Sequence, residues 1–140
     1  RRSSDLQIIE SIDPAGDISI LFDLMEKDEE KKQFLTPVMK TFFTTIAKTF
    51  TNDIRLTYTS LGDKKIAAVI AYVMNDTYYL YNSGFDKDCC NIAGFYLKAM
   101  SIKTSIETGL KTYNFLQGSE RYKYELNGQD FGVYKISLSL

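Results

Sequence analysis

The sequence predicts one α+β domain in which helices flank a mixed, mostly antiparallel sheet. Three observations predict this fold. Two helical patterns come first, three runs with an apolar period of two follow, and a third helical pattern then precedes two further strands. A strand, a crossing helix and a second strand form a βαβ unit, so the strands at 77–85 and 112–116 should be parallel neighbours in one sheet.

Two amphipathic helices are expected first. In 16–32, apolar residues recur at helical spacing opposite acids and lysines. In 36–50, Thr36 is suited to the N-cap and Pro37 to the first helical position. Four apolar side chains of this second helix fall on roughly one face: Val38, Phe42, Ile46 and Phe50.

From Ile54 the apolar period changes to two. Runs at 54–60, 65–74 and 77–85 are separated by glycine and Asn-Asp turn signals, which predicts an antiparallel meander of three strands. The middle run is apolar at nearly every position, so it should be covered on both faces.

The third helix is expected at 91–109, with Gly109 as a left-handed stop. Its apolar residues at helical spacing are Phe95, Ala99, Ile102 and Ile106. The strand at 112–116 runs into a polar and aromatic loop at 115–128, and 131–140 alternates cleanly and is predicted as a closing strand.

Composition limits the classes of protein. With 140 residues, 44% hydrophobic and 25% charged, the chain 1–140 is long enough to bury a core as a single domain. A net charge of -1 without a basic patch predicts no nucleic-acid partner. No apolar run approaches the roughly 20 residues of a membrane span, so we expect a soluble protein. Because the chain starts at Arg1 without a methionine, we expect the C-terminal part of a longer protein, with an N-terminal domain missing.

Cysteine and histidine counts limit the chemistry. Cys89 and Cys90 are adjacent and have no partners for a disulfide framework or a metal site, which predicts a reducing, cytoplasmic location and no metal. Neither has an adjacent base, so we interpret them as small residues at a helix start. The absence of histidine excludes Ser-His-Asp and Cys-His triads. Acid–base chemistry would therefore use carboxylates, tyrosines, lysines, the backbone or water.

The stretches "YNSGFD", "AGFYL" and "GLKTYNFLQGSERYKYEL", in this order of elements, resemble the GNAT acyltransferase superfamily. More narrowly they resemble the CelD/BcsL-like acetyltransferase-domain family, distantly related to FemAB aminoacyl transferases. The matching positions are Gly84, Phe85, Asp86, Gly94, Leu97, Gly109, Phe115, Leu116, Gly118, Glu120, Tyr122 and Lys123. The chain departs from the family pattern at Ala93, Asn114, Gln117, Ser119 and Arg121. The resemblance covers about 17–135, and the departures at 114–121 weaken the case for catalysis more than that for the fold.

The resemblance implies transfer of an acetyl or other acyl group from acyl-coenzyme A, such as acetyl-CoA, to an amine or hydroxyl. The acceptor would be a small molecule or a cell-surface polysaccharide precursor. The pyrophosphate is expected at the helix start formed by Asn91, Ala93 and Gly94, where backbone N–H groups meet the positive end of the dipole. Lys87 and Lys98 would add positive charge. In the alternative interpretation, Gly94 only lets the chain enter the helix, and the two lysines are ordinary solvated side chains.

The loop at 115–128 would form the acceptor side. There the resemblance implies that Glu120 holds or deprotonates the acceptor and that Tyr122 protonates the leaving thiolate. For Lys123, the implied role is to bind the acceptor if that acceptor is an anion. The alternative is a packed corner, with tyrosine rings at the edge of the core and hydroxyls in water. A position beyond the end of a strand favours a site.

Two other functions stay open at this point. The domain could be a GNAT-like binding or scaffold module without catalysis, which the replaced loop positions would suit. It could also be half of a FemAB-like aminoacyl transferase, which would need a second domain and contact with tRNA. The balanced charge of the chain argues against that contact.

Overall fold

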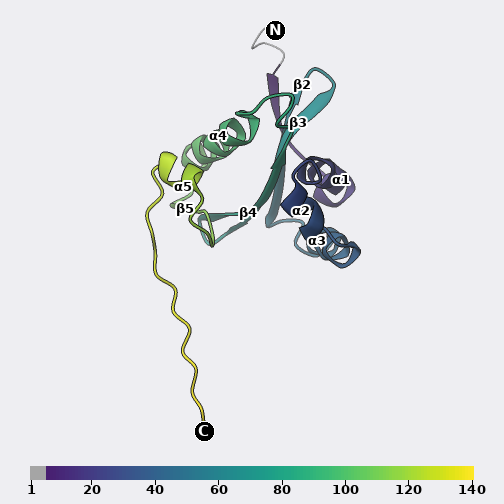
Figure 1. The fold of residues 1–140 in the computed structure, drawn as a ribbon. Coiled ribbons are helices and arrows are strands. Elements are labelled where there is room, and N and C mark those ends of the chain that lie inside the picture. The colour runs from purple at the N-terminus through teal and green to yellow at the C-terminus, as the bar shows by residue number, and fades with distance from the viewer. Residues whose placement is uncertain (1–5) are drawn as a thin grey trace.

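The computed structural model describes residues 6–140 as a five-stranded sheet with helices on both faces (Figure 1). The strands lie in the order β1-β2-β3-β4-β5. Their bounds are β1 Leu6–Glu10, β2 Ile54–Leu61, β3 Lys64–Met74, β4 Thr77–Phe85 and β5 Thr112–Asn114. Neighbours from β1 to β4 are antiparallel, whereas β4 and β5 are parallel. The predicted meander and the parallel βαβ pair are confirmed.

Three helices cover one face of the sheet and one long helix covers the other (Figure 1). The first group is α1 Pro14–Met25, α2 Glu29–Phe34 and α3 Pro37–Thr49. The second face carries α4 Ala93–Glu107, and the short helix α5 Arg121–Glu125 follows β5. β1 and α5 were not predicted: β1 is a short edge strand, and α5 spans only five residues. None of the helices formed by residues 6–140 has the length and apolar character needed to cross a bilayer.

The prediction of one helix at 16–32 was wrong, because the chain leaves the helical path at Asp28. This residue has extended dihedral angles, and its carboxylate accepts a hydrogen bond from the backbone N–H of Lys31 at 3.2 Å. An aspartate that caps a new helix competes with continuation of the preceding one. The result is that α2 turns away from α1 and presents Lys31 to the end of β4.

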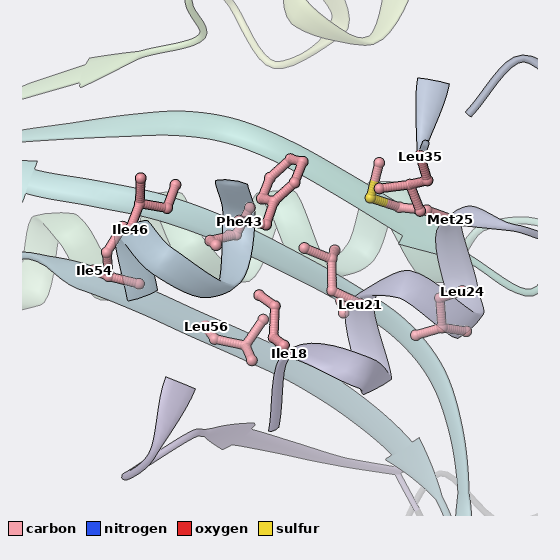
Figure 2. Close-up of a cluster of buried hydrophobic side chains, with 11 residues drawn as sticks. Ile18, Leu21, Leu24, Met25, Leu35, Phe43, Ile46, Ile54 and Leu56 are labelled. Atoms are coloured by element: carbon pink, nitrogen blue, oxygen red, sulfur yellow. The ribbon is translucent and has the colours of Figure 1, made fainter. Parts of the chain in front are cut away.

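The main core lies between the sheet and helices α1 and α3 (Figure 2). Thr36 and Pro37 open α3 as predicted. The predicted face of α3 was right only for Ile46, which is buried: Val38, Phe42 and Phe50 are exposed, and Phe43 is buried instead. Phe43 contacts the aromatic rings of Phe22 on α1, Phe34 on α2 and Tyr81 on β4, and such ring pairs stabilise a buried aromatic side chain.

One extra residue sits in β4. Ile70 and Ala71 of β3 are consecutive, but they pair with Asn82 and Leu80, so Tyr81 forms a bulge. Such an insertion changes which face the following side chains occupy. Beyond it the backbone of Gly84 lies against α1, where an added Cβ would be 2.4 Å from the backbone nitrogen of Met25. The end of β4 is therefore in direct backbone contact with α1.

Helix α4 buries a mixed face, which corrects the predicted apolar stripe; its buried residues are Ala93, Gly94, Leu97, Lys98, Ser101 and Ser105. Phe95 and Ile106 are 39% and 71% exposed, while Ser101 and Ser105 are buried. The two serine hydroxyls donate to the carbonyls of Lys98 and Ser101 in their own helix, at 2.7 and 2.8 Å. Because these hydrogen bonds satisfy the hydroxyls locally, their burial carries little penalty.

The prediction of a closing strand at 131–140 was also wrong. The segment carries no strand hydrogen bonding, and its apolar side chains are exposed. In Figure 1 it leads away from the body of the domain to the C-terminus. β5 has only three residues, 112–114, so its outer edge offers a very short ladder to a further strand.

Candidate active site

The parallel strands β4 and β5 part soon after they meet. They pair only through 77–79 of β4 and 112–114 of β5, whereas β4 stays paired with β3 as far as Phe85. We call the region between 80–85 of β4 and 115–120 after β5 the fork. Backbone groups on the β5 side of this part of β4 are thus released from a strand ladder, which is the condition for contact with a ligand.

Buried Asp86 organises the loop from β4 to α4. Its carboxylate accepts hydrogen bonds from the backbone N–H groups of Asp88 and Cys89, both at 3.1 Å. It also forms ion pairs with Lys64 at 2.8 Å and Lys27 at 3.6 Å. The hydrogen bond from Lys64 is the main reason that the pKa of Asp86 falls to about 2. Asp86 therefore stays ionised and holds the chain in place before α4 begins.

The N-terminus of α4 differs from those of the first three helices. Side chains of Asp13, Asp28 and Thr36 cap α1, α2 and α3, but Ile92 provides no side-chain hydrogen bond to α4. N–H groups in the first turn of a helix have no partner within the helix, so an uncapped end favours an anion. The predicted phosphate turn begins at this end, at Asn91.

The predicted members of this turn have different surroundings. Asn91 is exposed, whereas Ala93 and Gly94 are buried. An added Cβ at Gly94 would lie 2.8 Å from the Phe85 ring, so close packing against that ring already accounts for the glycine. Lys87 is exposed and forms an ion pair with Asp28 at 2.7 Å. The direct role of these residues in phosphate binding stays a prediction.

Lys123 holds the loop that follows β5. Its buried ammonium donates to the carbonyls of Gln117 at 2.8 Å and Gly118 at 3.2 Å, and it pairs with Glu120 at 2.8 Å. These contacts fix a turn in which Gly118 has a φ of 116°. The loop is therefore a built structure that directs Glu120 toward the fork, and the hydrogen bond from Lys123 lowers the pKa of Glu120.

Lys98 reaches the same place from α4. It is only 7% exposed, and its ammonium lies 4.2 Å from the centroid of the Tyr122 ring. Burial, with a further contribution from the positive charge of Lys31, lowers the pKa of Lys98 to about 8. Burial and the charge of Glu120 raise the pKa of Tyr122 to about 12. Lys98 and Tyr122, which are separate in the sequence, thus share one site.

Lys31 is a site residue that sequence reasoning missed. It extends from α2, on the opposite face of the sheet, and its ammonium donates to the carbonyl of Ser83 at the fork. Burial lowers its pKa, and its charge acts on Glu120 and Lys98. In the sequence, Lys31 stands in an acidic and basic run that is typical of a solvated helix face, so no pattern marks it out.

A protein-family model with the description "Acetyltransferase (GNAT) domain" matches residues 4–124. The chain belongs to this GNAT acetyltransferase family. No match was found among curated proteins.

Solved structures with the same fold cover nearly the whole GNAT domain. An aminoglycoside acetyltransferase from an uncultured soil metagenomic sample is 17% identical, with a TM-score of 0.67 and coverage of 97% of this chain and 98% of that one. A predicted acetyltransferase from Clostridium acetobutylicum, solved with acetyl-CoA, is 10% identical, with a TM-score of 0.68 and 96% coverage of both chains. An acetyltransferase from Trypanosoma brucei is 14% identical, with a TM-score of 0.62 and coverage of 97% and 100%. At these identities the likeness concerns the fold.

Removal of Lys98 is expected to stabilise this GNAT domain. Below pH 8 the folded state carries the full penalty of a buried charge, and the penalty disappears as the pH rises toward the ordinary value of 10.5. Lys98→Met should therefore raise the free energy of unfolding by about 1–2 kcal/mol at pH 7, after the loss of the contact with Tyr122. Urea unfolding at pH 7 and 9.5 checks this: the gain should shrink at the higher pH. Lys103→Met, an exposed change on the same helix, is the control, and a destabilised Lys98→Met would contradict the prediction.

Proposed function

We propose that the domain transfers an acetyl or other acyl group from acyl-coenzyme A to an amine or hydroxyl. The observation that carries this proposal is the parting of β4 and β5 after three paired residues on each strand. A thioester bound at the fork would meet backbone N–H groups of β4 on the side that no ladder of the described strands covers. One of these groups, the Ser83 N–H, donates to Oδ1 of Asn82 at 2.8 Å and would exchange this partner for the thioester carbonyl. Such donors stabilise the oxyanion that develops when a nucleophile adds to that carbonyl.

Two features of the chain fit coenzyme A. Beyond Tyr79, β4 pairs with no described strand on its β5 side and can offer hydrogen bonds there to the amide groups of the pantetheine arm. The start of α4, from Asn91 to Gly94, has no side-chain cap and suits a pyrophosphate. Lys87 and Lys98 were both predicted as cations for this ligand. Because Lys98 lies against the Tyr122 ring of the acceptor loop, we keep only Lys87 as a cation for coenzyme A. The acetyl-CoA named with the Clostridium acetobutylicum structure, which shares this fold, supports an acyl-CoA co-substrate here.

The loop residues have protonation states suited to distinct roles. Because Glu120 has a lowered pKa, it is ionised at neutral pH and can hold an ammonium group. For the same reason it is only a weak base for the removal of a proton from that group. Tyr122 keeps its proton at neutral pH and can donate it to the leaving thiolate. Lys123 is committed to the loop carbonyls, and we assign it to positioning Glu120.

The acceptor is proposed to be a small polar molecule or a cell-surface polysaccharide precursor. Structures with this fold are titled as complexes with sisomicin and with trehalose, which supports small polar acceptors. Membership of the CelD/BcsL-like subfamily, a cytoplasmic location and a preceding domain also stay predictions. A scaffold without catalysis would not require buried lysines such as Lys98 at the fork, so their presence favours an enzyme.

Coenzyme A binding measured by calorimetry tests the proposal. The chain should bind coenzyme A saturably, and Ile92→Asp should weaken binding at least tenfold, because a carboxylate would compete with phosphate for the first turn of α4. Ile106→Asp makes the same charge change at the other end of the helix and should bind normally. Ile92 and Ile106 are both exposed, at 64% and 71%, so both variants should fold. No binding by the parent would reject the proposed function, and equal binding by both variants would reject the phosphate site.

A further inference from the structure

Two ammonium groups face the fork from opposite sides of the sheet without a carboxylate partner. Lys31 comes from α2 and contacts the carbonyl and, at 3.5 Å, the hydroxyl of Ser83. Lys98 comes from α4 and contacts the Tyr122 ring. Neither lysine forms an ion pair with any acid in the described part of the chain, residues 6–140.

The acids near these lysines already form ion pairs with other lysines. Asp28 pairs with Lys87 at 2.7 Å, and Glu120 pairs with Lys123 at 2.8 Å. Lys31, Lys98 and Lys123 are buried or half-buried and bring three positive charges to the fork, whereas Glu120 brings one negative charge. The net charge of these four groups is therefore positive. Proteins rarely bury charges unless they are paired, because desolvation costs several kcal/mol per ion. The arrangement calls for an anion supplied from outside the described chain.

The position of Glu120 helps to identify this anion. Glu120 interacts electrostatically with both Lys31 and Lys98, so a negative charge lies at the edge of the positive site. A pyrophosphate would be repelled by this carboxylate. A ligand that carries a carboxylate and an ammonium would match both charges, with the carboxylate toward the lysines and the ammonium toward Glu120.

We propose that the acceptor is an amino carboxylate, held by Lys31 and Lys98 through its carboxylate and acylated on its amine. This inference rests on the proposed function. In the reaction, the amine nitrogen attacks the thioester carbonyl carbon, a C–N bond forms and the C–S bond breaks. The electron pair of that bond goes to sulfur. Before the attack, the bound ammonium gives one proton to Glu120, from which it passes to water. After the attack, the nitrogen loses a second proton to Glu120 or water, and the thiolate gains one from Tyr122, which recovers it from solvent. The products are an amide, free coenzyme A thiol and one proton released to water.

Matched acceptors test the proposal directly. The common amino acids, as an equimolar mixture, and a mixture of their primary amides would each be incubated with the domain and acetyl-CoA. Thiol release and product mass are measured. We expect acetylation of the carboxylates to exceed that of the amides at least tenfold in the parent. In Lys31→Met and Lys98→Met the preference should fall to about twofold or less, while Lys103→Met should keep it.

Two binding measurements separate the sources of failure. Coenzyme A affinity should change less than about twofold in Lys31→Met and Lys98→Met. A tenfold loss would mean that the lysines bind a phosphate of the co-substrate, which would overturn the inference. Acetate should raise the melting temperature of the parent more than acetamide does at equal ionic strength, and this difference should vanish in Lys98→Met. If that difference is absent, or if amides are acylated as well as carboxylates, the inference is wrong even where coenzyme A binds. If coenzyme A does not bind, the proposed function fails by itself.

Discussion

Gly84→Ala is expected to lower the free energy of unfolding by about 3 kcal/mol or more, because the added methyl group would overlap backbone atoms. Its Cβ would lie 2.4 Å from the nitrogen of Met25 and 2.6 Å from the carbonyl carbon of Leu24. Backbone atoms in the middle of a packed layer cannot move aside as a flexible side chain can. The whole of α1 would have to separate from β4, and urea unfolding would measure the loss.

Gly62→Ala is the matched control for this change. Gly62 has a φ of +59°, and no atom lies within 4 Å of an added Cβ, so only backbone strain is introduced. The cost should be about 1–2 kcal/mol. If Gly84→Ala proved no more costly than Gly62→Ala, the close contact between β4 and α1 would be contradicted.

Asp86→Asn is expected to cost about 3 kcal/mol at pH 7, since it removes a buried charge that two lysines and two backbone N–H groups share. The pKa of Asp86 is about 2 in the folded state and close to 3.8 when unfolded. A lowered pKa contributes stability that is complete above the unfolded value and is lost as the pH falls through the folded value. The difference between parent and variant should therefore be constant from pH 7 to 5 and smaller at pH 3.

Asp88→Asn provides the comparison within the same loop. Asp88 is exposed, and its carboxylate forms no ion pair with the described residues, so the change should cost less than about 0.5 kcal/mol. Urea unfolding of both variants at pH 7, 5 and 3 is the measurement. An Asp86→Asn difference that did not shrink at pH 3 would show that shape, and not charge, makes Asp86 important.

The sheet could be predicted from the sequence because its signals are local and agree with one another. The runs between Ile54 and Phe85 combine period-two apolarity with turn residues, and the crossing helix fixes the direction of the next strand. The buried face of helix α4 could not be predicted in this way. Phe95 and Ile106 belong to the predicted apolar stripe but are exposed, and the serines at 101 and 105 are buried instead, because their hydroxyls are satisfied within the helix.

The candidate site could be predicted only in part. The loop around Glu120 and Tyr122 is marked by its composition, and the structure adds Lys98 to it from α4. Lys31 could not be found, because its role depends on the break at Asp28 that turns α2 toward the fork. The contact between Lys31 and Ser83 depends on the path of the chain in three dimensions. A sequence pattern in which Lys31 is one of several charged residues in a row does not indicate it.

The bulge in β4 interrupts the alternation of faces along the sequence of the strand. Tyr78 and Leu80 face the core under α4, whereas Gly84, an even-numbered residue beyond Tyr81, meets α1, and Phe85 turns toward Gly94. Leu80 and Asn82 pair with the consecutive residues Ala71 and Ile70, so a chain without Tyr81 would continue as a regular ladder with Gly84 and Phe85 on the faces they have now. A relative could therefore lose this one residue and keep the glycine against α1. By contrast, an insertion or deletion of one residue between Asn82 and Gly84 would exchange the two faces.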